Sequence, residues 1–208
     1  MAEKNPTMKI LTIIIIAALI ISVGILIYTN IPKPTDQGTN GPPSGNETRT
    51  PILTVVFDGV QKNYTLQEIQ GIIPYKGRGG YRTSFPSIKG IGNYTGVPIT
   101  ALIQETNISI ENYSIIVYSS DNSSITYNYS QILGNVDRYN PDNASDPTPI
   151  GHGGLSMVLC YQYEGNLLNV SKDGTLKIAF LDQSGSITKS SLWWKYVISI
   201  TIVPEIVP

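Results

Sequence analysis

The chain has little of the chemistry on which most enzymes and disulfide-bonded domains depend. Among its 208 residues, Cys160 is the only cysteine and His152 the only histidine. An intramolecular disulfide is therefore excluded, as is a zinc site built from two or more such side chains of one chain. A Ser-His-Asp triad would have to use His152, which lies in a glycine-rich stretch. We expect His152 to be a solvent-exposed loop residue, and the sequence names no catalytic residue.

Strong charge of either sign is also missing. The formal net charge is −1 and no long run of like charge occurs, which argues against a nucleic-acid partner. Asp137, Asp142 and Asp146 share one segment, but their spacing does not match a calcium loop. We expect solvated acids there and no metal site. Sequence motifs for phosphate-binding loops, dinucleotide binding, haem attachment and iron–sulfur clusters are absent as well.

An apolar segment near the start of the sequence has the length of a membrane span. Residues 10–28, ILTIIIIAALIISVGILIY, carry no charge, and about 20 such residues cross the hydrocarbon core as a helix. Lys4 and Lys9 precede the run, so we expect residues 1–9 in the cytoplasm and the chain after the span outside. A cleaved signal peptide is the alternative, but the run exceeds a usual h-region and no small-x-small site follows. We predict a single-pass plasma-membrane protein whose residues 10–28 contact lipid.

The rest of the chain divides into a spacer and a folded domain. Residues 29–50 are rich in proline and glycine, which predicts a flexible linker. Over residues 51–208, short alternating apolar runs are bounded by Gly, Asn, Asp and Pro, the pattern of strands and turns. Thr65 and Glu68 have the spacing of a capping box, which predicts a short helix. Predicted strands clearly outnumber helices, so we expect an extracellular domain of the α+β class that is mostly β.

Two polar segments of this domain are candidates for ligand binding. In YKGRGGYRTSFPSIKG, residues 75–90, several glycines would let backbone amides approach a phosphate or carboxylate. The basic residues of this segment are Lys76, Arg78, Arg82 and Lys89. An ordinary hairpin with solvated basic residues is the alternative. Residues 134–153 lack a periodic pattern and contain Arg138 and His152; a structureless segment of that length is usually functional or disordered.

Acceptor sites for N-linked glycans are dense in the part predicted to lie outside. Nine of the fifteen asparagines begin an Asn-X-Ser/Thr triplet without proline. They are Asn46, Asn63, Asn93, Asn107, Asn112, Asn122, Asn128, Asn143 and Asn169. This density fits an exported glycoprotein, and chance triplets in a chain rich in Asn, Ser and Thr are the alternative. Many such sites without disulfides, together with 31 isoleucines, indicate an archaeal cell surface.

Three segments carry a family resemblance. They are YTLQEIQGI (64–72), NYTGVPITALIQE (93–105) and MVLCYQYEGNLL (157–168). The first resembles a Tyr-Thr-Leu-x-Glu/Asp-Leu helix opening, the second a Trp/Tyr-Thr-Gly-Val-Pro-Leu turn and helix, and the third a Leu-x-Tyr-x-x-Asn-Gly-x-x-Leu strand. These motifs belong to the molybdopterin-binding domain of the sulfite oxidase family, including its small single-domain prokaryotic relatives. With weaker matches elsewhere, the resemblance covers about residues 52–203 and implies a sulfite-oxidase-type fold.

The resemblance also implies where the family's chemistry would lie. Its enzymes hold molybdenum by a pterin dithiolene and one cysteine, about a dozen residues before the turn glycine. Counting back twelve from Gly96 reaches Ser84, and a hydroxyl is a poor ligand for a soft, thiolate-preferring centre. We expect Cys160 to be a small buried hydrophobe. The family contacts the pterin through Arg, His and backbone groups, for which this chain offers Arg78, Arg82, Lys89, Arg138 and His152.

The sequence therefore predicts a membrane-anchored extracellular glycoprotein whose molybdopterin-binding-like domain is non-catalytic, with a ligand-binding or structural role. We expect that the domain binds no cofactor. Molybdopterin is the one cofactor that the resemblance allows. The alternative is a membrane-tethered molybdopterin-dependent oxidoreductase with an atypical metal shell. In either case a redox protein or a cell-envelope protein is the expected kind of partner.

Overall fold

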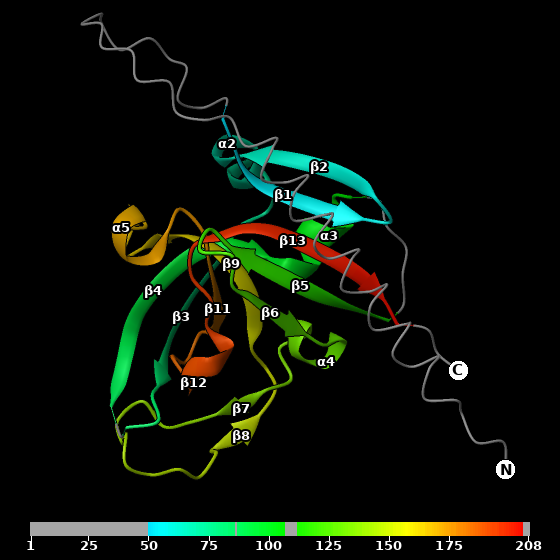
Figure 1. Ribbon diagram of the computed structural model, residues 1–208. Coiled ribbons are helices and arrows are strands. Elements are labelled where there is room, and N and C mark those ends of the chain that lie inside the picture. Colours follow the sequence, from blue (N-terminus) through cyan, green and yellow to red (C-terminus); the bar gives the residue numbers. More distant parts are fainter. Residues whose placement is uncertain (1–49, 86, 107–111, 206–208) are drawn as a thin grey trace, which may run out of the picture. The chain divides into compact units, whose positions relative to one another are not determined.

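The computed structural model describes residues 50–85, 87–106 and 112–205 (Figure 1). Within these ranges the chain forms thirteen strands, four α-helices and one 3-10 helix, so the domain is mostly β, as expected. No helix among the described residues is long and apolar enough to cross a membrane. The predicted tail and span, residues 1–28, lie outside the described residues, as do linker residues 29–49 and the acceptor sites Asn46 and Asn107.

One sheet has five strands in the order β2-β1-β13-β5-β6. Their bounds are Pro51–Phe57 (β1), Val60–Thr65 (β2), Tyr113–Ser119 (β5), Ser124–Tyr127 (β6) and Val197–Pro204 (β13). β1 and β13 run parallel, whereas the other neighbours are antiparallel. β1 alternates as the sequence predicts, with Leu53 and Val55 buried. The pair Asp58-Gly59 predicts a hairpin turn, and both residues have positive φ in the tight turn to β2, which confirms it.

The second sheet has the order β10-β9-β4-β3-β12, and β11 also pairs with β9. The bounds are Tyr75–Arg82 (β3), Ile88–Pro98 (β4), Ser156–Tyr163 (β9), Asn166–Leu167 (β10), Lys177–Leu181 (β11) and Thr188–Lys189 (β12). A bridge between Arg78 and Asp182 joins β3 to the end of β11. Since β11 pairs with β9, β9 with β4, and β4 with β3, these four strands close a small ring.

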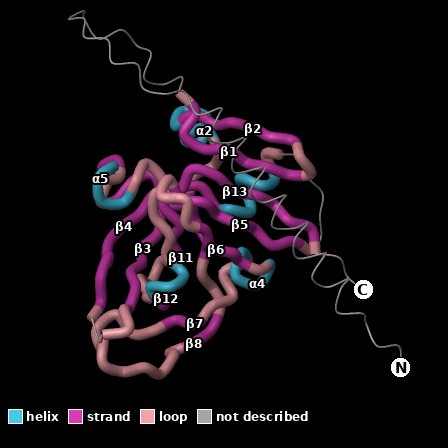
Figure 2. The backbone as a smooth tube through the Cα atoms, in the orientation of Figure 1, coloured by secondary structure: helices cyan, strands magenta, loops and turns pink. Residues whose placement is uncertain are grey.

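The main core lies between the two sheets and is covered by short helices (Figure 2). The helices are Leu66–Gly71 (α2), Ile99–Gln104 (α3), Tyr129–Ile132 (α4), Val170–Asp173 (α5) and the 3-10 helix Ser190–Leu192 (η2). All five residues of β11 are buried because its two faces meet different cores. Ile178 and Phe180 face the main core, whereas Ala179 and Leu181 join a smaller core with Trp193. The predicted capping box of α2 is present, with Thr65 and Glu68 bonded reciprocally.

Three local expectations were wrong. Gly96 does not form a turn before α3 but lies inside β4 opposite Cys160, where a side chain would collide with the backbone of Leu159. The segment 134–153 is not structureless, because Asp137–Arg138 (β7) pairs with Gly151–His152 (β8). Residues 192–203, LWWKYVISITIV, have the pattern of one strand, but the last strand starts only at Val197, after Tyr196 with a φ of 55°.

Candidate functional site

The basic segment 75–90 forms the β3–β4 hairpin, which was the alternative to a ligand-binding loop. Its glycines serve strand packing. A Cβ on Gly79 would lie 2.7 Å from the carbonyl oxygen of Phe180, and one on Gly77 3.0 Å from that of Asp182. Only glycine permits backbones to approach so closely. These residues therefore allow β3 to meet β11 and close the ring of strands.

Two of the predicted basic residues line one cavity, which we call the basic groove. It has a volume of about 680 Å³, and Lys76 and Arg78 are its charged residues. Its remaining side-chain lining is Asn93, Tyr94, Thr95, Gln162 and Gln183. At its rim, Glu164 accepts a hydrogen bond from the backbone N–H of Asn93 at 2.7 Å, and this bond holds the pKa of Glu164 below its ordinary value. Two cations among amide groups suit an anionic or polyhydroxylated ligand.

The other basic residues of the hairpin lie elsewhere. Arg82 donates to the carbonyl oxygens of Asp146 (2.6 Å) and Ala144 (3.4 Å), and its guanidinium lies 4.9 Å from the ring centre of Tyr139. Arg82 therefore fastens the β7–β8 segment to the hairpin and is not free to hold a ligand. Ser84 and Lys89 are exposed near the end of the hairpin, and neither lines the basic groove.

A second cavity, the polar pocket, lies beside β7 and β8. Its volume is about 380 Å³, and its charged residues are Asp137, His152 and Lys189. The His152 Nδ1 lies 3.0 Å from the Asp137 Oδ1, and the Lys189 Nζ lies 3.9 Å from the Asp137 Oδ2. His152 is exposed, as predicted, but the sequence analysis missed Lys189, which is more than 30 positions away and carries no motif. Arg138, the neighbour of Asp137, does not line this pocket.

Amide and hydroxyl groups complete the polar pocket. Besides its three charged residues and two apolar ones, it is lined by Asn128, Ser130, Gln131, Asn135 and Ser191. Asn128 and Gln131 cap helix α4 reciprocally, through bonds of 2.9 and 3.0 Å. The alternation in NSSITYNYS, residues 122–130, predicts Asn128 on the polar face of a strand, but the strand ends at Tyr127 and Asn128 is the N-cap of α4. Such a lining can hydrogen-bond a small polar ligand.

The single thiol is enclosed, as expected. Cys160 lies in the smaller core with Val158, Ala179, Leu181 and Trp193 and has no exposed surface. Burial raises the pKa of this thiol well above its ordinary value. A thiolate, the form that binds metals, is therefore strongly disfavoured. Among the described residues, no group of three or more His, Cys, Asp or Glu side chains is placed to hold a metal ion.

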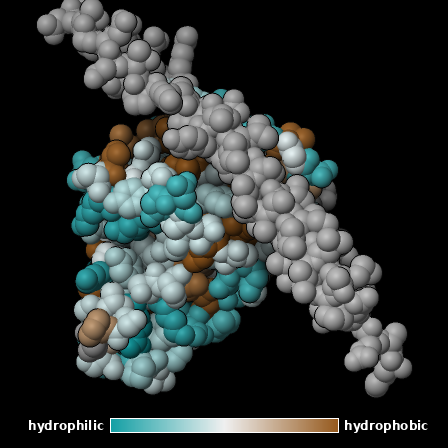
Figure 3. Space-filling view, viewed as in Figure 1, coloured by the Kyte–Doolittle hydropathy of each residue, from teal (hydrophilic) through white to brown (hydrophobic). Residues whose placement is uncertain are grey.

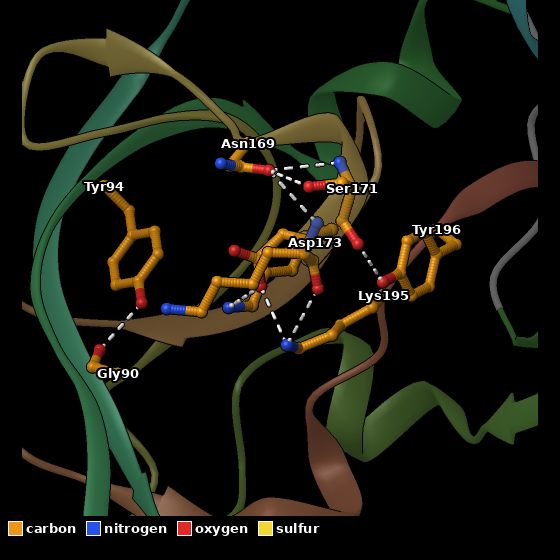
Figure 4. Close-up of polar contacts among 9 residues, drawn as sticks. Gly90, Tyr94, Asn169, Ser171, Asp173, Lys195 and Tyr196 are labelled. Carbon is orange, nitrogen blue, oxygen red and sulfur yellow. Dashed lines mark hydrogen bonds and ion pairs between the residues drawn. The ribbon is translucent and has the colours of Figure 1, made fainter.

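A buried ion cluster closes one end of the smaller core (Figure 4). Asp173, at the end of α5, forms two ion pairs: its Oδ1 lies 3.1 Å from the Lys177 Nζ and 3.0 Å from the Lys195 Nζ. The Lys177 Nζ also lies 5.1 Å from the Trp193 ring centre and 5.4 Å from that of Tyr94. Burial alone would raise the pKa of Asp173, but the two ammonium groups lower it below its ordinary value. This cluster joins three segments distant in sequence, and Asp173, Lys177 and Lys195 line neither the basic groove nor the polar pocket.

The structure describes seven of the nine predicted glycan acceptors. Six are exposed, and Asn112 is half-buried. On the face drawn in Figure 3, hydrophilic and neutral residues predominate and apolar ones form small separate groups. The described acceptors are thus sterically open to a bulky modification, which must point to water.

Comparison with solved structures shows the kind of fold. The structure is similar to a chain in the crystal structure of the sulfane dehydrogenase SoxCD from Paracoccus pantotrophus, with a TM-score of 0.51 and 11% sequence identity. The likeness covers 74% of this chain and 38% of that one, so this chain spans well under half of its length. No protein-family model and no curated protein matches the sequence. The likeness supports the mostly β, sulfite-oxidase-like fold that the sequence resemblance implies.

The described residues do not fit the usual molybdenum site of the sulfite oxidase family. The position implied for the metal-ligating cysteine is Ser84, an exposed residue near the hairpin end. The only thiol, Cys160, is sealed in a core. The basic residues are divided among the basic groove, the hairpin end and the β7–β8 segment instead of converging on one cavity. We therefore derive no reaction step through a molybdenum centre.

Proposed function

We propose that this chain is a membrane-anchored glycoprotein of the cell surface, whose sulfite-oxidase-like domain binds a ligand or has a structural role without catalysing a redox reaction. The sequence supports the anchor and the glycans through the apolar run 10–28 and the nine acceptor triplets. The fold likeness supports the domain type. An archaeal source remains part of the proposal and rests on composition alone.

The observation that supports the non-catalytic role is the position of the chain's one thiol, that of Cys160. A molybdenum centre of this type needs a thiolate at the mouth of a cavity that also holds the pterin. Here Cys160 packs against Val158, Ala179 and Trp193 in a closed core, and Ser84 stands where the resemblance places the ligand. Fold can persist when the residues of a site are replaced.

The basic groove is the proposed ligand site of this domain. Lys76 and Arg78 belong to one strand and line the cavity together with the amide residues Gln162 and Gln183. Guanidinium and ammonium groups attract carboxylates, phosphates and sulfates, while amides hydrogen-bond hydroxyl groups. An acidic saccharide or another polyanion of the cell envelope is the ligand class that this lining favours.

A membrane-tethered molybdopterin-dependent oxidoreductase with an atypical metal shell is the second candidate. The fold likeness to a sulfane dehydrogenase favours it. It would have to hold the pterin through Lys76, Arg78 or the polar pocket without a protein thiolate, and it would need a separate electron partner. The division of the basic residues among separate places weakens this candidate.

The surface-glycoprotein proposal predicts a measurable mass and location. The full chain, isolated from the cells that make it naturally, should sediment with the membranes and remain there after a high-salt wash. Its intact mass should exceed the 22.7 kDa of the polypeptide, with sugar mapped to acceptor peptides by mass spectrometry. An unmodified polypeptide of 22.7 kDa in the soluble fraction would contradict the proposal.

A further inference from the structure

The outer strands of both sheets offer backbone edges for pairing. β2 and β6 end the five-stranded sheet, and β10 and β12 end the path of the second sheet. An outer strand presents N–H and C=O groups to which a second copy of the chain can add a strand. β2 is the longest of them, its residues 60–63 are all exposed, and Val60 is 71% exposed. Natural proteins usually obstruct such edges.

Glycan acceptor sites lie at three of these four outer strands. Asn63 is inside β2, and Asn128 follows the last residue of β6 directly. Asn122 lies two residues before β6, and Asn169 two residues after β10. All four asparagines are exposed. The acceptor triplets therefore gather at the places where the described sheets are open.

The fourth outer strand is covered by the chain itself. Directly before β12, Ile187 exchanges two backbone hydrogen bonds with Tyr139, at 2.8 and 3.3 Å, so the β7–β8 segment occupies this edge. No described acceptor triplet lies next to β12. The remaining described acceptors are Asn93 inside the central strand β4, Asn112 just before the central strand β5, and Asn143 between β7 and β8.

The hydrogen bonds of the edge asparagines are compatible with glycosylation. A glycan attaches to the amide nitrogen, whereas these side chains use the oxygen. The Oδ1 of Asn63 accepts from the Thr54 hydroxyl at 2.9 Å, and that of Asn128 from the Gln131 N–H at 2.9 Å. The Oδ1 of Asn169 accepts from the Ser171 hydroxyl at 2.7 Å. By contrast, Asn93 places its amide nitrogen 3.3 and 3.4 Å from the Glu164 carboxylate.

We propose that glycans at Asn63, Asn122, Asn128 and Asn169 keep the open edges of both sheets from pairing with a second copy of this chain. The inference rests on the glycosylation in the proposed function. Paired strands lie roughly 4.8 Å apart, and a hydrated glycan at the edge holds a second backbone farther away than that. The surface can then be crowded with this protein without edge-to-edge assembly.

The experiment compares two glycan-deficient forms of the full chain, made in a host that glycosylates Asn-X-Ser/Thr and kept in detergent. The edge variant carries Asn63→Gln, Ser124→Ala, Ser130→Ala and Ser171→Ala. The matched control, which keeps the edge sites, carries Thr95→Ala, Ser114→Ala and Ser145→Ala. Removing the hydroxyl leaves the asparagine caps in place. Asn63→Gln keeps an amide, adds no charge to the outer strand and spares Thr65, which caps α2.

Light scattering should show that the edge variant self-associates at a roughly tenfold lower protein concentration than the wild type, while the control behaves like the wild type. Adding Val60→Lys to the edge variant should restore the monomer, because a charge on an outer strand opposes pairing. Intact mass measures how much sugar each form carries, and thermal unfolding tests whether each form is folded. Should the fourfold variant unfold, Asn63→Gln alone, on an exposed strand, gives the same comparison for β2 without adding a charge.

Three outcomes would overturn the inference. The wild type could carry sugar at the edge sites and still be no more monomeric than the edge variant, which lacks that sugar. This result would refute edge protection and leave the proposed glycoprotein intact. A control variant that associates as readily as the edge variant would show a general effect of sugar on solubility. A wild type without any sugar would remove both the inference and the glycoprotein proposal.

Discussion

Lys177 is a charged residue buried beside the smaller core. A lysine is seldom buried, yet its side chain here is 4% exposed and its ammonium meets Asp173 and the rings of Tyr94 and Trp193. Breaking a buried ion pair from one side costs about 3–5 kcal/mol when the other charge is left alone. Asp173 keeps Lys195 as a second partner at 3.0 Å, so the loss here should be smaller.

We predict that Lys177→Ala lowers the free energy of unfolding by about 2–4 kcal/mol, through lost packing and a lost ion pair. Lys177→Met, which keeps the long stem between the two rings, should lower it by only about 1 kcal/mol. Urea unfolding at neutral pH measures both values. Lys195→Met, at a partly exposed position, is the control and should have little effect. Equal losses for Ala and Met would mean that the charge, and not the packing, decides the effect.

At the scale of elements, the turn after β11 closes the ring of strands. Asp182 directly follows this strand and accepts hydrogen bonds from the Gly185 N–H at 2.5 Å, the Ser184 hydroxyl at 2.7 Å and the Ser186 N–H at 3.1 Å. Burial alone would raise the pKa of Asp182, but the hydrogen bonds from Ser186, Ser184 and Gly185 lower it below its ordinary value. The ionised carboxylate thus stabilises the turn that brings β3 to β11.

The sign of the pH effect follows from this lowered pKa. The contribution of Asp182 is present above its unfolded pKa of about 3.9 and is lost as the pH falls through the folded value. We predict that Asp182→Asn, made in a host without N-glycosylation because the change creates an Asn-Gln-Ser triplet, is less stable than the wild type by about 1–3 kcal/mol at pH 7. The difference should shrink on acidification below about pH 4. Urea unfolding at several pH values measures it, with Asp142→Asn as the exposed control. A difference that is constant down to the lowest pH would contradict this account.

Elements with a local cause were predictable from the sequence. The capping box fixes the start of α2 at Thr65 and Glu68, and the alternation of Leu53 and Val55 identifies β1, because both signals lie within a few residues. The β7–β8 pair was not predictable. It depends on Arg82 binding the carbonyl oxygens of Ala144 and Asp146 and on the bridge of Tyr139 to Ile187, which are contacts between residues more than 40 positions apart.

The candidate sites show the same division between local and distant causes. Lys76 and Arg78 were recognisable because they share a short basic segment, and the structure places both in the basic groove. Gln162, in β9, and Gln183, in the turn after β11, line the same groove but are distant from Lys76 in sequence and carry no sequence signal. Lys189 joins Asp137 and His152 only because β12 runs beside β3 and the β7–β8 segment reaches that edge.

At the scale of the whole molecule, a sulfite-oxidase-like fold holds no thiolate where the resemblance places the metal ligand. The absence of a cysteine at the metal-ligand position can be read from the sequence, because it concerns the single residue Ser84. The burial of Cys160 was also expected, but the residues that enclose it could not be predicted, since this depends on three strands and Trp193 packing together. The two observations together carry the central claim that the fold is retained and its redox chemistry is lost.

The most direct test is cofactor content. The full chain should be produced in a host that makes molybdopterin, and molybdenum, tungsten and oxidised-pterin fluorescence should be measured per mole of purified protein. We predict that all three stay far below one equivalent, and that Lys76→Ala and Arg78→Ala do not change them. Metal and pterin near one equivalent, lost when Arg78 is replaced, would contradict the account and make this chain an oxidoreductase that holds its cofactor without a protein thiolate.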